Sequence, residues 1–294
     1  MNPSEPPVRP SFAHRFGKFI RFSHTIFALP FALGAMITAA NGDLFPPQLG
    51  WILGCVICAR TVGMCFNRLV DWDFDKTNPR TADRHTLITK TQGWTILSLS
   101  ALAAAYCASR LNTLCFALSP VMLVLVCFYS LTKRFTAFSH FFIGLALAQA
   151  PVGAWAAIRG SIFDLPPLLL GTGVLLWTFG FDLIYSTLDT QHDQRLGLFS
   201  FPSRYGIPAA LRLAKGLHLV AASAFIAFGV VANLSLPYHI ASGLSAVALI
   251  AEHRLAAKTD PGAINKAFFN VNAMVSVLLL AGIILHFTRS HSPA

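Results

Sequence analysis

The fold of this chain is decided by the stretch Asn67-Arg68-Leu69-Val70-Asp71-Trp72-Asp73-Phe74-Asp75-Lys76-Thr77-Asn78-Pro79-Arg80-Thr81-Ala82-Asp83-Arg84. It follows a hydrophobic segment from about residue 49 to residue 66, so its acidic groups are expected at the end of a membrane helix. Asn67, Asp71 and Asp75 are four residues apart and would share one face of a helix. Carboxylates at a bilayer boundary are costly unless a cation compensates them, and oxygen ligands suit Mg²⁺. The stretch therefore predicts a metal site at a membrane surface.

The composition is that of a polytopic membrane protein. Of the 294 residues, 55% are hydrophobic and 12% are charged, whereas a soluble domain carries roughly 25% charged residues. The formal net charge of +10 comes from basic residues between apolar segments, not from a solvated basic patch with exposed aromatic side chains. Nucleic acid is therefore not expected as a partner. The six cysteines lie inside apolar segments and are expected to pack as small hydrophobic side chains.

The apolar segments predict an all-α fold. With about 20 apolar residues per crossing, the sequence contains about nine spans. They are expected near residues 20–40, 48–70, 92–110, 112–131, 136–158, 166–188, 210–232, 235–253 and 268–288. Residues 1–15 are expected to form a disordered tail, since the chain begins Pro-rich and polar. Residues 16–290 then form a single transmembrane domain.

The distribution of basic residues predicts the orientation. Most Lys and Arg residues fall on the side of the N-terminus, and few fall on the other side. The positive-inside rule then places the N-terminus and the acidic stretch in the cytoplasm, and an odd number of spans places the C-terminus outside. We expect a multi-pass protein of the cell (inner or plasma) membrane.

A second polar cluster follows the sixth predicted span on the same side. It contains Asp182, Tyr185, Asp189 and Asp193, and its spacing predicts one helical face. It begins roughly 115 residues after Asn67, again at the cytoplasmic end of an even-numbered span. The arrangement suggests a four-helix unit used twice, with one further helix at the end.

Two facing sets of carboxylates flanked by Arg and Lys match the needs of a diphosphate with its Mg²⁺ ions. Each Mg²⁺ would bridge carboxylates to phosphate oxygens, and guanidinium groups would bind the remaining oxygens. The alternative is that the acids only pair with neighbouring Arg and Lys side chains in solvated loops. Two clusters with matching spacing favour the metal site.

The motifs resemble those of the UbiA superfamily of intramembrane aromatic prenyltransferases. The first signature is similar to N-x-x-x-D-x-x-x-D from Asn67 to Asp75 with the trailing Arg80-Thr81 and Arg84, and the second to D-x-x-Y-x-x-x-D-x-x-x-D from Asp182 to Asp193. Tyr129 with Lys133-Arg134-Phe135-Thr136 looks like the loop motif Y-x-x-x-K-R-x-T of the family. The resemblance extends from about Arg21 to the last span. It implies a ring-like bundle of nine helices around a central cavity.

The resemblance also implies a reaction and a set of roles. A polyprenyl diphosphate would ionise with the help of Mg²⁺, and the allylic cation would alkylate an aromatic acceptor of the 4-hydroxybenzoate type in ubiquinone or menaquinone biosynthesis. The metal ligands would be Asn67, Asp71, Asp75, Asp189 and Asp193. Lys133, Arg80 and Arg84 would bind the diphosphate. Arg134 would bind the carboxylate of the acceptor, and Tyr185 would stabilise the cation or orient the acceptor.

The sequence also departs from the common family pattern, and alternatives stay open. Arg68 follows Asn67 where the hydroxybenzoate enzymes of the family tend to have an acid. The segment Ala82-Asp83-Arg84-His85-Thr86-Leu87 also differs from the sequence that those enzymes tend to have after the Arg-Thr pair. Other segments of the chain are more similar to a branch of the family that is associated with prenylation of a futalosine-derived menaquinone precursor. A superfamily member with another acceptor, a lipid-phosphate hydrolase and a membrane ion or solute transporter are further alternatives. Prenyl length, the general base and the oligomeric state are not indicated by the sequence.

Overall fold

The computed structural model describes residues 10–77, 81–257 and 260–290, and these residues form helices and their connections. The long helices are α2 (Leu29–Ala39), α3 (Leu49–Val70), α5 (Lys90–Ser109), α6 (Thr113–Thr132), α7 (Ser139–Arg159), α8 (Leu165–Ser186), α11 (Ile207–Val231), α12 (Leu236–Ala256) and α14 (Asn272–Ser290). The short helices are α1 (Phe12–Phe19), α4 (Trp72–Thr77), α9 (Thr190–Arg195), α10 (Phe201–Tyr205) and α13 (Pro261–Lys266). The remaining helical elements are the 3₁₀ helices η1 (Phe22–Phe27), η2 (Ala82–Thr86) and η3 (Thr187–Asp189), and the π-helix η4 (Ala267–Val271).

The prediction of an all-α membrane fold is confirmed, but the count of about nine spans is not. Within the described ranges, 7 segments are long and apolar enough to cross a membrane. They are Phe22–Ala39, Leu49–Val70, Thr113–Thr132, Ser139–Arg159, Leu165–Arg195, Ile207–Val231 and Phe268–Arg289. A helix occupies each range that the sequence marked as a span, but α5 and α12 do not belong to this set.

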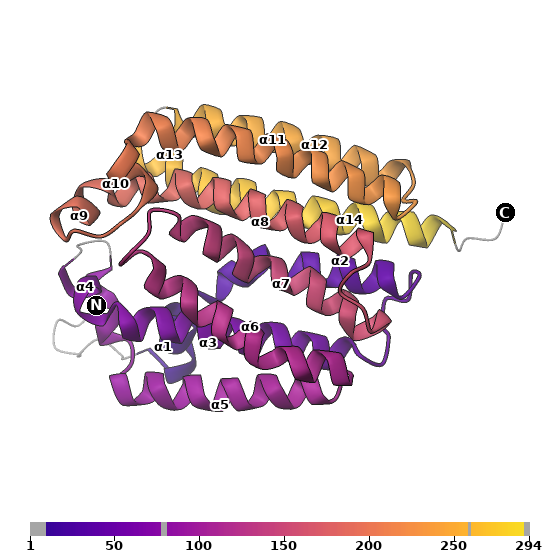
Figure 1. The fold of residues 1–294 in the computed structure, drawn as a ribbon, viewed down its shortest axis with the longest axis horizontal. Helices are drawn as coiled ribbons and strands as arrows, with labels where there is room; N and C mark the ends of the chain where they lie inside the picture. The colour runs from indigo at the N-terminus through magenta and orange to yellow at the C-terminus, as the bar shows by residue number, and fades with distance from the viewer. Residues whose placement is uncertain (1–9, 78–80, 258–259, 291–294) are drawn as a thin grey trace, which may run out of the picture.

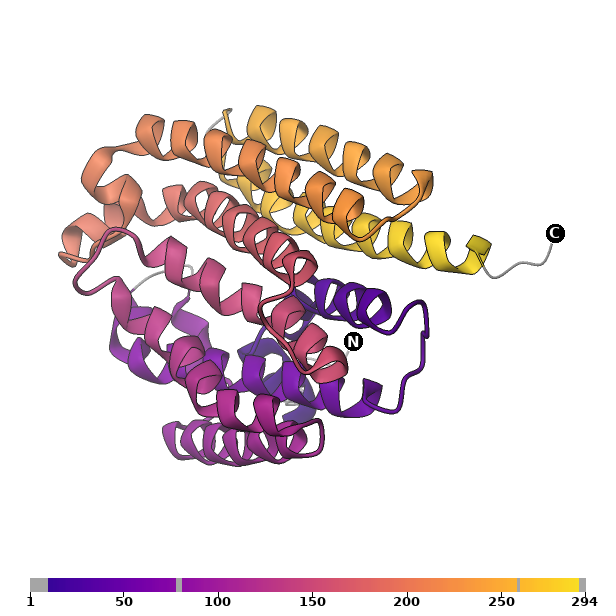
Figure 2. The same ribbon diagram turned by 45° about the vertical axis from the view of Figure 1, so that its right-hand side comes forward.

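The long helices run alongside one another (Figure 1). Residues of α3, α6, α7 and α8 line a cavity between them. Six of the long helices form a closed ring of contacts. Helix α2 packs on α7, α7 on α8, α8 on α11, α11 on α12, α12 on α14, and α14 on α2. Helices α3, α5 and α6 extend the bundle from α7 on its other side (Figure 2). The short helices α4, α9, α10 and α13 gather at one end of the bundle (Figure 1). The segments that follow α3 and α8 therefore lie at the same end. The predicted repeat of two four-helix halves stays a prediction.

Close helix packing and an apolar outer surface fit a protein dissolved in lipid. A Cβ atom on Gly144 would lie 2.5 Å from the Leu175 carbonyl oxygen, so α7 and α8 approach more closely than a larger residue would permit. Small residues at helix contacts are typical of membrane bundles. Inside, Phe31 stacks on Phe225 with ring centroids 5.7 Å apart. The outward-facing large apolar side chains include Leu99, Leu102, Val121, Val124, Leu219, Val230 and Val247.

The N-terminal segment is ordered earlier than the sequence suggested. Helix α1 begins at Phe12, and the side chain of Ser11 accepts a hydrogen bond from the His14 N–H at 3.3 Å. Residues 12–15, which were expected in the disordered tail, are therefore helical because a Ser N-cap starts the helix. The part of the tail before residue 10 lies outside the described residues.

Candidate active site

The first motif lies where α3 gives way to α4. The spacing predicted one continuous helix, but α3 ends at Val70 and Asp71 is its C-cap. The Asp75 N–H still donates to the Asp71 carbonyl at 2.8 Å, so the chain makes a helical turn across the break. Asn67, Asp71 and Asp75 therefore still line one cavity. Asp71 is buried, with 3% of its surface exposed.

Basic side chains contact the two carboxylates of this motif. Lys133 Nζ lies 2.6 Å from Asp71 Oδ2, and Arg134 Nη2 lies 3.3 Å from Asp71 Oδ1. Arg84 Nη1 donates to both carboxylate oxygens of Asp75, at 2.9 Å and 3.1 Å. Cations predicted to bind a diphosphate thus lie next to the acids predicted to bind the metal. Arg80 lies outside the described residues.

The second motif spans three consecutive helical segments and not the single helical face that its spacing predicted. Asp182 and Tyr185 lie on α8, Asp189 ends η3, and Asp193 lies on α9. The 3₁₀ turn between α8 and α9 breaks the α-helical period, yet all these side chains line the same cavity. His140 Nδ1 lies 2.7 Å from Asp182 Oδ2, which anchors α7 to the second motif.

The cavity has a volume of about 310 Å³ and brings both motifs together. Of the residues that the sequence selected, those lining it are Asn67, Asp71, Asp75, Arg84, Lys133, Tyr185, Asp189 and Asp193. Arg134 does not line it, but its side chain bonds to the Val70 carbonyl at 2.9 Å and to Asp71. The residues expected to form two opposing walls therefore face one space.

The donor set fits a hard cation in its chemistry. The carboxylates and the Asn67 amide supply oxygen ligands, which Mg²⁺ prefers. Within the ranges that the structure describes, no three acidic, His or Cys side chains are arranged closely enough to hold one ion. Since Mg²⁺ usually takes one or two carboxylates together with substrate phosphates and water, two separated walls of acids suit a metal held jointly with a diphosphate.

Three arginines that line the cavity, Arg21, Arg60 and Arg68, were not assigned a role from the sequence. Arg60 Nε donates to Thr25 Oγ1 at 3.0 Å, and its Nη2 donates to the Arg21 carbonyl at 2.9 Å. Arg68 Nη1 donates to Asn67 Oδ1 at 3.2 Å and lies 3.8 Å from Asp75 Oδ2. A charge inside an apolar span is a functional candidate by default, so the position of Arg60 within the second span was a usable signal.

An aromatic wall closes the cavity on the side of the last helix. We use this name for Phe27, Phe181, Tyr185 and Phe268. The rings of Tyr185 and Phe268 stack with centroids 4.0 Å apart and planes 28° apart. Phe268 also meets Phe27 and Phe181 edge-on, in both cases with centroids 5.5 Å apart. Arg21 Nη1 donates to the Tyr185 hydroxyl at 3.3 Å. No sequence pattern distinguished these Phe residues from the others.

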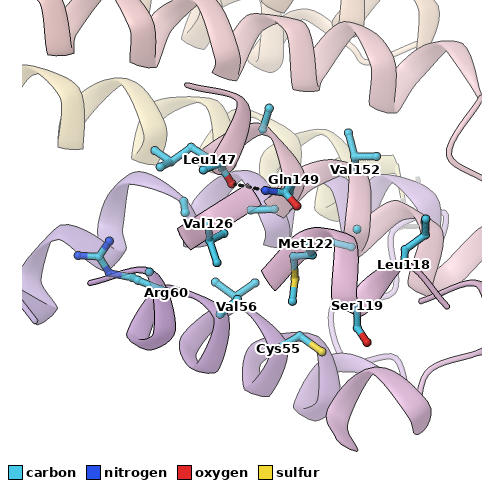
Figure 3. A pocket seen from close by; sticks show the side chains of 18 of the residues that line it. Cys55, Val56, Arg60, Leu118, Ser119, Met122, Val126, Leu147, Gln149 and Val152 are labelled. Atoms are coloured by element: carbon cyan, nitrogen blue, oxygen red, sulfur yellow. Dashed lines mark hydrogen bonds between the residues drawn. The ribbon is translucent and has the colours of Figure 1, made fainter. Parts of the chain in front are cut away.

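A second, apolar cavity of about 410 Å³ adjoins the polar one. Figure 3 shows its lining, with Val56, Met122, Val126 and Leu147 among the side chains that face it. The residues that line both cavities are Ala28, Arg60, Met64, Tyr129, Ile143 and Leu147. The polar site therefore opens into a space suited to a long hydrocarbon chain.

Comparison with known proteins agrees with this geometry. A model of the UbiA prenyltransferase family matches residues 28–274. The chain belongs to this family. This confirms the resemblance drawn from the motifs and makes the protein a prenyltransferase integral to a membrane. The enzyme from Nitrosospira multiformis named 4-hydroxybenzoate octaprenyltransferase is 28% identical over 261 residues, which cover 88% of this chain and 89% of that one.

Solved structures show the same fold. A UbiA homologue from Aeropyrum pernix is 29% identical, with a TM-score of 0.81 over 89% of this chain and 97% of its own. A UbiA homologue from Archaeoglobus fulgidus, solved with DMAPP and Mg²⁺ bound, is 16% identical, with a TM-score of 0.70 over 92% of this chain and 99% of its own. At that identity the likeness shows the shared fold alone.

Proposed function

We propose that this prenyltransferase uses Mg²⁺ to transfer a polyprenyl group from a polyprenyl diphosphate to an aromatic acceptor of the 4-hydroxybenzoate type, in ubiquinone or menaquinone biosynthesis. The observation that carries the proposal is the junction of the two cavities. A cavity lined by both acidic motifs continues into an apolar cavity through shared lining residues. A polyprenyl diphosphate has the same two parts, a charged head and a long apolar tail.

The cavity residues have distinct tasks in this reaction. Asn67, Asp71, Asp75, Asp189 and Asp193 would hold Mg²⁺, which when bound neutralises charge on the leaving diphosphate. Lys133 and Arg84 bind phosphate oxygens, with Arg80 as a further candidate from the sequence. The allylic C–O bond breaks with its electron pair leaving on the diphosphate. A ring carbon of the acceptor then forms the new C–C bond and loses its proton to a base.

The aromatic wall and Arg60 extend this assignment. The face of Tyr185 attracts a carbocation through its π electrons, and a wall of rings keeps water from it. Arg60 lies where the polar and apolar cavities meet, so it is a second candidate, besides Arg134, for binding the carboxylate of an aromatic acid. Arg60 lines the polar cavity and Arg134 does not, which favours Arg60 for this role.

The test is prenyl transfer by purified protein in lipid vesicles. Labelled polyprenyl diphosphate and 4-hydroxybenzoate should give a prenylated ring only when Mg²⁺ is present. Asp71→Ala and Asp189→Ala should abolish the product. Asp73→Ala is the matched control, because the Asp73 side chain is 81% exposed and does not line the cavity. Full activity in both cavity variants would refute the proposal.

Acceptor identity needs a separate experiment, because the same diphosphate chemistry serves a futalosine-derived acceptor. Incubating the protein with one donor and a panel of aromatic acids that includes an aminofutalosine, with mass detection, identifies the acceptor directly. Vesicle uptake of ions without prenyl transfer would instead support the transporter alternative. The motif acids lie at the ends of α3 and α8 and not along a path across the bundle, which favours the enzyme.

The proposed setting is the cell (inner or plasma) membrane, with the site at the cytoplasmic surface. The excess of Lys and Arg in the loops at the end that carries the motifs supports this orientation. A polyprenyl diphosphate would then enter from the cytoplasmic leaflet with its tail in lipid. The orientation is tested by labelling a cysteine introduced near Asp83, in a variant whose six native cysteines are replaced, in intact and permeabilised cells. Labelling in intact cells would contradict it.

A further inference from the structure

A buried polar network lies behind the aromatic wall. Its central residues are Glu252 on α12 and Asn272 on α14, both with 0% of their surface exposed. Asn272 Nδ2 donates to Glu252 Oε1 at 2.7 Å and to the Phe268 carbonyl at 3.0 Å. On α11, His218 Nδ1 accepts a hydrogen bond from His253 Nε2 of α12 at 3.1 Å and lies 3.6 Å from Glu252 Oε2. The network thus joins three helices to the residue whose ring stacks on Tyr185.

The same network reaches α8 directly beside the wall. His218 Nε2 lies 3.1 Å from the Trp177 carbonyl oxygen, and because a carbonyl only accepts, this nitrogen carries the proton. A Cβ atom on Gly180 would collide with the His218 ring, so α8 and α11 touch at this point. Gly180 immediately precedes Phe181 of the wall. The network therefore fixes the backbone on both sides of the wall, at Phe181 and at Phe268.

An acid at this place is costly. Glu252 lies inside a helical bundle, away from water, where a carboxylate loses its hydration and an apolar side chain would pack without that loss. Buried ion pairs and hydrogen-bonded acids contribute little net stability, so stability does not explain it. What Glu252 does contribute is an acceptor that orients the Asn272 amide toward the Phe268 carbonyl.

The orientation of the Asn272 amide affects the backbone conformation at Phe268. Phe268 lies in the π-helix η4, where the regular i to i+4 ladder is interrupted. A π-turn has i to i+5 backbone bonds in place of the regular ones, and the Asn272 side chain adds a donor for the Phe268 carbonyl. If that bond is lost, η4 is free to relax toward a regular helix. Such a change rotates the Phe268 ring relative to Tyr185.

We infer that Glu252 and Asn272 are positioning residues for the reaction. They hold η4 in the conformation that keeps Phe268 stacked on Tyr185 at the wall of the cavity. The inference rests on the proposed function, in which this wall faces the allylic cation. A displaced wall admits water to the cation, so the donor is hydrolysed to prenyl alcohol in place of transfer to the acceptor. The residues that bind the diphosphate are untouched.

Three variants separate positioning from a general loss of structure. Asn272→Leu removes the amide at similar size. Glu252→Gln removes the charge but keeps an oxygen that accepts from Asn272. Tyr238→Phe is the matched control, because it also removes one buried bond of α12, from the Tyr238 hydroxyl to the Phe225 carbonyl at 2.9 Å. Tyr238 precedes Glu252 by about 21 Å along the helix axis.

The ratio of prenyl alcohol to prenylated acceptor is the decisive measurement. Asn272→Leu takes away the side-chain donor to the Phe268 carbonyl, so it should lower kcat by about tenfold and raise the ratio by a similar factor. The KM for the donor should stay within about threefold of the original, because the residues that bind the diphosphate are unchanged. Phe268→Leu should shift the ratio in the same direction. Glu252→Gln and Tyr238→Phe should leave it unchanged.

Two results would overturn the inference. The first is an unchanged product ratio in Asn272→Leu. The second is a fall in kcat and a rise in the ratio in Glu252→Gln as large as those in Asn272→Leu. Transfer by the unaltered protein establishes the proposed function separately from either result. If the unaltered protein transfers no prenyl group, hydrogen exchange still tests the structural part, because Asn272→Leu should speed exchange in residues 264–272 and Tyr238→Phe should not.

Discussion

Replacing Arg68 by Gln removes a buried positive charge from the wall of the polar cavity. The Arg68 side chain is 7% exposed and lies 3.8 Å from Asp75 Oδ2. Asp75 keeps its bidentate contact with Arg84, at 2.9 Å and 3.1 Å, so Arg68→Gln leaves no buried acid without a cation. The Gln side chain can still donate to Asn67. The loss of folding stability should therefore stay below the 3–5 kcal/mol typical when one partner of a buried ion pair is removed.

Removing this charge should also weaken the binding of the diphosphate. Two unit charges about 4 Å apart interact by about 4 kcal/mol at an effective dielectric of 20, and a hydrogen bond to a charged group retains about 1.5–3 kcal/mol of net free energy. Arg68→Gln should therefore lower kcat/KM for the polyprenyl diphosphate by roughly 10- to 100-fold. Lys76→Gln is the control, because Lys76 is exposed and pairs with Asp73 at 3.5 Å, outside the cavity. A value within about twofold of the original for Arg68→Gln would refute the reasoning.

Three further predictions follow from the packing and the surface. Met122→Trp narrows the apolar cavity, so transfer from long donors should fall by about tenfold or more while a short allylic donor is still used, as product analysis with donors of graded length would show. Gly144→Ala forces a Cβ against a backbone carbonyl of α8 at 2.5 Å and should cost about 1–3 kcal/mol in thermal unfolding, whereas Gly216→Ala, with nothing within 4 Å, should not destabilise. Lys18 donates to Asp83 at 3.0 Å and lowers the pKa of that carboxyl. The pair therefore contributes fully above the unfolded pKa of about 4, and its contribution is lost as the pH falls through the lower folded pKa. Lys18→Ala should cost less than about 1 kcal/mol at pH 7 and less in acid.

The meeting of the two motifs could be predicted from the sequence because it depends on topology. Asp71 follows one span and Asp189 follows another that ends on the same side, so their loops share one end of the bundle. The helix breaks could not be predicted. A spacing of four residues is the same whether the helix continues or pauses at Asp71, and the 3₁₀ turn before Asp189 leaves no mark on the spacing.

Contacts between side chains that are distant in the sequence could not be predicted either. Phe268 is one of 25 Phe residues, and only the fold shows that its ring meets Tyr185. Arg60 and Glu252 differ in this respect, because each is a charge within a predicted span and could have been selected on that ground. Their partners come from other helices, so the sequence could mark the residues but not their roles.

The ion pairs in the polar cavity bear on the choice between a metal site and simple charge pairing. Pairing in solvated loops would leave the acids exposed, but the side chains of Asp71 and Asp75 are 4% and 16% exposed. Buried pairs contribute little net stability, because the loss of hydration offsets the attraction.

The described lining residues carry as many carboxylates as Lys and Arg side chains: Asp71, Asp75, Asp182, Asp189 and Asp193 against Arg21, Arg60, Arg68, Arg84 and Lys133. A cavity with matched charges accepts a diphosphate together with its metal ions, since cations and anions then enter as a set and each carboxylate that gives up an Arg or Lys gains a metal. The two interpretations are therefore compatible, because the cations paired with the acids are the same ones that the phosphate oxygens would bind.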